Sequence, residues 1–98
     1  MTYSLTEAAD RDLADLYLWG AERFGEAKAD SYSAALKTTF ELLSRHPFMA
    51  RELRHFRTPV RVHPCGSHVI IYRVENDGEI LIVRIRHVRE NWLSQPLD

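Results

Sequence analysis

Residues 68–88 read HVIIYRVENDGEILIVRIRHV, and this stretch predicts a β-hairpin. The first arm, residues 68–75, is rich in β-branched and aromatic side chains, which favour strands. Asn76-Asp77-Gly78 then gives a strong turn signal. In the second arm, residues 80–88, successive side chains alternate between the two faces of a strand. One face holds Leu81, Val83 and Ile85, and the other holds Ile80, Ile82, Arg84 and Arg86. Because both faces are apolar at the centre, we predict that this strand lies inside a sheet.

Two more strands are predicted upstream of this hairpin. Val60 and Val62 alternate with Arg61 and His63, as in a strand with one apolar face. Residues 64–67, Pro-Cys-Gly-Ser, then predict a turn that leads into residue 68. At the beginning of the chain, residues 2–5 alternate weakly and predict a short further strand.

Two helices are predicted in the first half of the chain. Thr6 offers an N-cap, and acidic residues follow in the first turns, where they complement the helix dipole. These are Glu7, Asp10 and Asp12. The buried face has helical spacing and consists of Leu13, Leu16, Tyr17, Gly20 and Phe24. Gly20 inside this pattern is interpreted as a close-packing point or, alternatively, as a contact for a partner. Gly25 is placed to end the helix.

The second helix is predicted over residues 27–44. Its buried face recurs every three or four residues and consists of Tyr32, Leu36, Phe40 and Leu43. His46-Pro47 ends it, because the residue before a proline is driven out of the α region. Since the loop between the two helices is short, we expect them to pack antiparallel as a hairpin.

The predicted order is β-α-α-β-β-β, an α+β fold with an antiparallel sheet packed against an N-terminal helical hairpin. With 98 residues, one domain over residues 1–98 is expected. The composition, 45% hydrophobic and 28% charged, is that of a soluble globular protein. A net charge of -1 excludes nucleic-acid binding by bulk charge alone, and the single Cys65 excludes a disulfide scaffold. Without a secretory signal or a long apolar run, we expect a cytoplasmic protein that does not contact a membrane.

Arginine is concentrated in the middle of the chain. Between positions 45 and 73, six arginines accompany a single acidic residue, Glu52. They are Arg45, Arg51, Arg54, Arg57, Arg61 and Arg73. Arginine is suited to forked hydrogen bonds with carboxylate or phosphate groups. Two interpretations fit this stretch: a solvated basic surface, or a docking surface for an acidic partner.

The cysteine and histidine pattern favours neither a metal site nor nucleophilic catalysis. Cys65 lies near His63 and His68, but strand alternation and a turn do not make these groups converge. No paired C-x-x-C or H-E-x-x-H spacing occurs, and no glycine-rich phosphate loop is present. We therefore expect no metal and no cofactor. His87, between Arg86 and Arg89, has two interpretations: a residue closing the edge of the core, or a site residue supported by nearby cations.

Motifs in a fixed order extend over about 85 residues of the chain. They are Leu5-Thr6-x-x-Ala9-x-x-Asp12-Leu13-x-x-Leu16-Tyr17, Phe24-Gly25, Tyr32-x-x-x-Leu36-x-x-x-Phe40-x-x-Leu43, His46-Pro47, Arg51, Val60-Arg61, residues 68–73 and residues 82–87. This series resembles the ParE branch of the RelE/ParE toxin superfamily. The chain departs from that pattern at Ala50, where glycine is usual, at Pro59-Val60, where Gly-Leu is usual, and at Arg86, where leucine is common.

The resemblance implies the toxin of a type II toxin–antitoxin pair. Such a toxin inhibits DNA gyrase without catalysing a reaction, and a ParD-like antitoxin neutralises it in a hetero-oligomer. DNA would be reached only indirectly, through the antitoxin. A third interpretation is a protein-binding module without toxicity.

The alternative implied by the other branch is a RelE-like ribonuclease that cuts messenger RNA at the ribosome. Its catalytic candidates would be Arg61, Arg73, Arg84 and His87. Two features oppose it: residues 46–67 contain no lysine, and the chain has no tyrosine after Tyr72.

Two binding surfaces are expected for the toxin. The antitoxin is expected on the basic stretch, through Arg51, Arg54, Arg57 and Arg61. The cellular target is expected at the end of the last strand, through Arg84, Arg86, His87, Arg89 and Trp92, because Arg and Trp dominate binding hot spots. Trp92 has a competing interpretation, in which it folds back as a lid over the helices.

Overall fold

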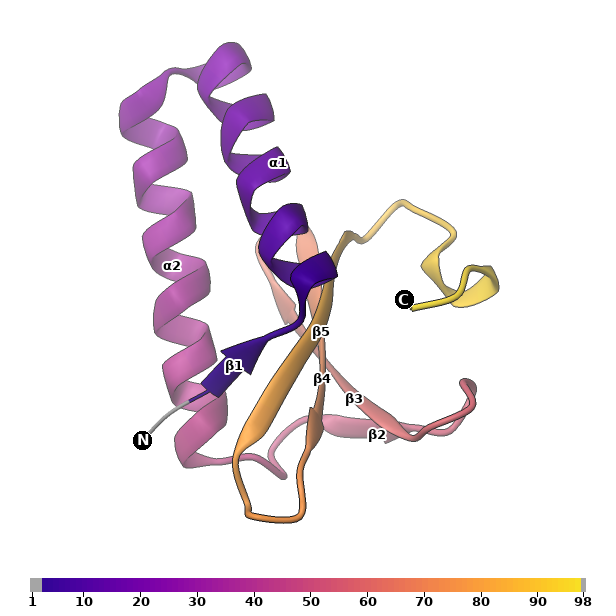
Figure 1. Ribbon diagram of the computed structural model, residues 1–98. Helices are drawn as coiled ribbons and strands as arrows, with labels where there is room; N and C mark the ends of the chain where they lie inside the picture. Colours follow the sequence, from indigo (N-terminus) through magenta and orange to yellow (C-terminus); the bar gives the residue numbers. More distant parts are fainter. Residues whose placement is uncertain (1–2, 98) are drawn as a thin grey trace.

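The computed structural model describes residues 3–97 and confirms the predicted helical hairpin, which covers one face of a sheet (Figure 1). Helix α1, Glu7–Phe24, begins where the side-chain oxygen of Thr6 accepts the amide of Ala9 at 3.0 Å, as an N-cap does. Helix α2, Glu26–Arg45, follows after a single residue, Gly25. The φ of Gly25 is 93°, a value that glycine adopts more readily than other residues. Two helices this close in sequence have to pack against each other.

The sheet has five strands in the order β1-β5-β4-β3-β2. Strand β1, Tyr3–Leu5, pairs parallel with β5, Ile80–His87, while the other neighbours pair antiparallel. The α+β fold is thus confirmed, with a mixed sheet in place of the wholly antiparallel sheet predicted. Thr6 extends the parallel edge, because its amide donates to Ile82 and its hydroxyl donates to Val83. The first residue of the predicted strand, residue 2, lies outside the described residues.

Two strands differ from the prediction. Strand β2, Arg51–Leu53, was not predicted, because three residues are too few to show an alternation. Strand β3, Val60–Cys65, runs through the predicted turn to residue 65 before turning into β4, His68–Val74. Pro64 fits in β3 because β2 pairs only as far as Val62, so β3 is an edge beyond that point.

A β-bulge in β5 changes which side chains share a face. Tyr72 pairs with Ile82 but Ile71 pairs with Arg84, so Val83 is an extra residue in the ladder. One inserted residue reverses the alternation that follows it. Ile85 consequently joins Ile82 in the core beneath the helices, and the predicted grouping of Leu81, Val83 and Ile85 on one face is wrong.

The sheet buries a core on each face. The larger core lies under the helices, where Leu36, Phe40 and Leu43 of α2 meet Tyr72, which is fully buried. The hydroxyl of Tyr72 donates to the carbonyl of Pro47 at 2.7 Å. The smaller core lies on the opposite face and consists of Val60, Val69, Ile71 and Val83. Strands β4 and β5 are therefore apolar on both faces.

Gly66 and Gly20 make a matched pair for testing this packing. A Cβ at Gly66, where φ is 60°, would lie 2.7 Å from the ring of Tyr32, whereas one at Gly20 would lie 3.8 Å from Ala29. Gly66→Ala should therefore lower the melting temperature by about 4 °C or more, since the left-handed conformation alone costs roughly 1 to 2 kcal/mol. Gly20→Ala should leave it unchanged or raise it, because alanine favours a helix. Thermal melts followed by circular dichroism measure both, and a neutral Gly66→Ala would contradict the close contact.

Candidate functional site

A buried carboxylate joins α1 to the bulge of β5. Asp12 accepts two hydrogen bonds from the guanidinium of Arg84, at 2.7 and 2.9 Å, and one from the amide of Ile85 at 3.0 Å. The two side chains are only 13% and 17% exposed. Hydrogen bonding to Asp12 raises the pKa of Arg84. Arg84 was expected at the target surface, but it forms a bidentate ion pair with Asp12 within the protein. Bidentate pairs of this kind are among the strongest hydrogen-bonded contacts.

Arg86 is also held inside the protein. Its guanidinium pairs with Glu90 and lies 3.9 Å from Asp12, and it donates to the side chain of Gln95 at 3.3 Å. Glu90 in turn accepts the amide of His87 at 2.9 Å. These contacts anchor the residues that follow β5, so Arg86 supports the C-terminal segment rather than standing free beside it.

Trp92 begins a short 3-10 helix, Trp92–Ser94, on the sheet face opposite the helices. Its ring stacks on Phe56 with centroids 6.5 Å apart, and together with Leu97 it covers the smaller core. His55 fixes this segment by donating to the carbonyl of Leu93 at 2.6 Å. The expected lid over the helices is thus wrong, because the chain after residue 87 turns to the other face (Figure 1).

The arginines expected to bind the antitoxin lie along β2, the loop after it and the start of β3. We call Arg51, Arg54, Arg57 and Arg61 the basic edge. Arg54 pairs with Glu52 at 3.3 Å, and Arg61 donates to the carbonyl of Ala50 at 2.7 Å. The Arg61 guanidinium also lies 5.0 Å from the ring of Phe48, which is 67% exposed. Within residues 3–97, Arg51 and Arg57 have no ion pair.

The four residues considered for ribonuclease chemistry do not form one site. Arg61 and Arg73 line one shallow depression of about 290 Å³. His87 instead lies opposite His68, at the other end of β4 from Arg73. Arg73 lies five positions after His68 along β4, which is about 17 Å at a rise of ~3.4 Å per residue. Arg84 is engaged by Asp12.

A cleft that the sequence did not reveal opens at the tip of the helical hairpin. We call it the hairpin-tip cleft; its volume is about 320 Å³, and its walls come from both helices and from the ends of β4 and β5. Trp19 and Phe24 border it with exposures of 50% and 59%, and their rings lie 5.9 Å apart, edge to face. Phe24 was expected on the buried face, but the last turn of α1 extends past the sheet and leaves it uncovered (Figure 1).

Tyr32, His68 and His87 form the inner end of this cleft. The hydroxyl of Tyr32 accepts the amide of Ser67 at 2.9 Å and lies 2.7 Å from Nδ1 of His68. The rings of His68 and His87 meet edge to face at 5.2 Å. Burial, together with the neighbouring His87, lowers the pKa of His68, and burial raises the pKa of Tyr32. Both shifts favour the neutral forms of these side chains.

The described residues contain neither a metal-binding group nor a membrane-spanning helix. Among residues 3–97, no group of three or more His, Cys, Asp or Glu side chains is arranged to hold a metal ion. His63, Cys65 and His68 accordingly do not form such a group. None of the described helices is both long and apolar enough to cross a membrane.

Comparison with known proteins gives one consistent family. The sequence family described as ParE toxin of type II toxin-antitoxin system, parDE, matches residues 3–92 of this chain. Toxin ParE1 of Caulobacter vibrioides is 33% identical over 89 residues, which cover 91% of each chain. Toxin ParE1 of Mycobacterium tuberculosis is 30% identical over 87 residues, or 89% of each chain. A solved chain from the chromosomal ParDE TA system of P. aeruginosa shares the fold, with a TM-score of 0.75 at 24% identity over 91% of this chain and 97% of that one.

Asp12 should be one of the most sensitive positions in the protein. Asp12→Ala leaves Arg84 without its partner in a site that is mostly closed to water, and breaking such a pair costs about 3 kcal/mol or more. The matched control is Glu75→Ala, which removes the more exposed pair with Arg73 and should cost less than about 1 kcal/mol. Urea unfolding curves give both values. Equal losses for the two variants would contradict the central role of Asp12.

Proposed function

This chain belongs to the ParE family of toxins from type II toxin–antitoxin systems, and we propose that it arrests growth by binding DNA gyrase without catalysing a reaction. The absence of catalysis is supported by one observation: the groups that RNA cleavage would need are dispersed over the protein. A ribonuclease requires a general base, a general acid and cations around one phosphate. Here Arg73 lies near one end of the paired strands β4 and β5 and His87 lies at the other end, and Arg84 is held by Asp12.

We propose that a ParD-like antitoxin docks on the basic edge and forms a hetero-oligomer with this chain. Arg51 and Arg57 offer unpaired charge, and the exposed ring of Phe48 beside Arg61 offers apolar contact. Strand β2 is the last strand of the described sheet, so an extended segment can add to it through backbone hydrogen bonds. An acidic, amphipathic segment matches all three features. DNA is then reached only through the antitoxin.

The target surface is proposed at the end of β5, in a protein that acts in the cytoplasm where gyrase works. His87 and Arg89 are its contact groups, because Arg89 is exposed and His87 lines a cleft. Arg84 and Arg86 support this end from inside, through Asp12 and Glu90. Trp92 fixes the following segment against the sheet.

The gyrase proposal is tested with two readouts. The purified protein should inhibit plasmid supercoiling by DNA gyrase, and primer extension on transcripts after induced expression should show no new cleavage sites. Arg73→Ala is the control, since it removes a ribonuclease candidate away from the target surface and should leave growth arrest intact. New transcript ends that vanish in Arg73→Ala would support the ribonuclease alternative and overturn the proposal.

Charge at the basic edge should govern how fast the antitoxin binds. The association rate with the product of the adjacent toxin–antitoxin reading frame should fall about tenfold or more between 50 and 500 mM NaCl, because salt screens charge steering. Arg57→Glu should slow association at low salt far more than Arg11→Glu, which changes the net charge equally but lies on α1. Stopped-flow fluorescence measures these rates. If both variants slow association equally, the basic edge does not provide the charge that steers the antitoxin.

A further inference from the structure

We propose that the hairpin-tip cleft is part of the target surface and receives an apolar side chain of gyrase that is flanked by carboxylates. This inference rests on the proposed function, because it names the surface through which a gyrase inhibitor would bind. The cleft adjoins the end of β5, and His87 belongs to both. It extends that surface onto the two helices, where Gly20, considered in the sequence as a contact for a partner, lines the cleft.

The apolar part of the cleft is unusually well exposed for so small a protein. Trp19 and Phe24 both leave at least half of their surface in water. Their edge-to-face arrangement holds the two rings 5.9 Å apart. A volume of about 320 Å³ lies at the lower end of the range for ligand pockets. Such a cleft suits one or two protein side chains.

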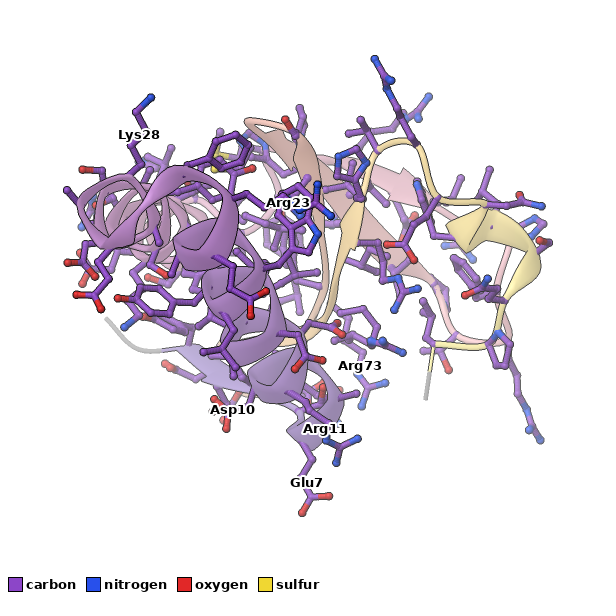
Figure 2. All side chains as sticks on the ribbon, turned by 90° about the horizontal axis from the view of Figure 1, so that it is seen from above. Glu7, Asp10, Arg11, Arg23, Lys28 and Arg73 are labelled. Atoms are coloured by element: carbon purple, nitrogen blue, oxygen red, sulfur yellow. The ribbon has the colours of Figure 1, made fainter. Side chains whose placement is uncertain are left out.

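The charge around the cleft determines what kind of segment fits. None of the ten residues that line it is acidic, and Lys28 is among them. Arg23 adds a second cation, with its guanidinium 4.7 Å from the ring of Trp19. Figure 2 looks down on the hairpin and shows both cations on this part of the molecule, Arg23 between α1 and the sheet and Lys28 pointing outward from α2. A neighbouring depression shares Trp19, His68 and His87 with the cleft and is also lined by Asp12, Asp15 and Glu90. The carboxylates of the partner are therefore expected beside Lys28 and Arg23, away from that depression.

The cleft is held in shape before any partner arrives. Tyr32 connects α2 to the turn between β3 and β4, because its hydroxyl accepts the amide of Ser67 and contacts His68. The close approach of Gly66 to the Tyr32 ring leaves no room for this turn to shift inward. A preformed pocket loses less entropy on binding than one that must be ordered. Tight binding of a few side chains is therefore feasible here.

The position of the cleft favours the target over the antitoxin. The hairpin tip and β2, which carries the basic edge, lie at opposite ends of the molecule (Figure 1). A partner on the basic edge therefore leaves the cleft open for a second protein. Among the groups proposed for the target, His87 lines the cleft and Arg89 follows two residues later. One continuous surface thus runs from Trp19 to Arg89.

The experiment compares three single variants on the hairpin. Trp19→Ala removes the largest wall of the cleft, Lys28→Glu reverses its charge, and Leu18→Ala is the matched control, since Leu18 is equally exposed but lines a different groove. Each variant is assayed for binding to immobilised DNA gyrase, for inhibition of supercoiling, and for binding to the antitoxin from the adjacent reading frame. Thermal melts check that all three are folded.

We expect Trp19→Ala and Lys28→Glu to weaken gyrase binding about tenfold or more and to leave antitoxin binding within twofold of the original chain. Leu18→Ala should change neither. If both cleft variants bind gyrase normally, or lose the antitoxin instead, the inference is wrong while the proposed function stands. If the unaltered chain itself neither binds nor inhibits gyrase, the proposed function fails and the inference fails with it.

Discussion

The structure depends on one carboxylate. Asp12 accepts hydrogen bonds from both the side chain of Arg84 and the backbone of Ile85, at the point where β5 is irregular. A bulge leaves backbone groups without ladder partners, and Asp12 supplies one from the helix above. The same contact fixes the position of α1 on the sheet. Arg84 also donates to the carbonyl of Leu97, so helix, strand and C-terminal segment meet at a single ion pair.

The arginines of this chain therefore have two different roles that composition cannot separate. Arg84 and Arg86 are mostly buried and paired, and they hold the fold together. Arg51 and Arg57 are exposed and have no ion pair within residues 3–97. Burying an unpaired guanidinium is prohibitive, so the internal pair has to be complete. The exposed arginines carry no such constraint. Their charge is available to the antitoxin proposed above.

Local sequence patterns predicted the parts of the fold that are locally determined. Both helices and the hairpin turn depend on caps, glycines and spacing within a few residues, and these were predicted almost to the residue. The parallel β1 and the role of Asp12 depend on partners more than seventy residues away, such as Val83 for Thr6. The bulge depends on the pairing of β5 with β4. The site followed the same rule. The basic edge was visible as a run of arginines, but the pairing of Arg84 and the cleft beside Trp19 arise only when the hairpin meets the sheet.

The pairing of β1 with β5 has a consequence for synthesis on the ribosome. Strand β1 and both helices are made first, yet the strand that completes their core ends at residue 87. At roughly 5 to 20 residues per second, the helical hairpin waits on the order of several seconds for β5 to be translated. During that time its apolar face has no sheet to cover it. The nascent chain is thus an open hairpin without a finished sheet, and its apolar face is exposed to chaperones and to early capture by a partner.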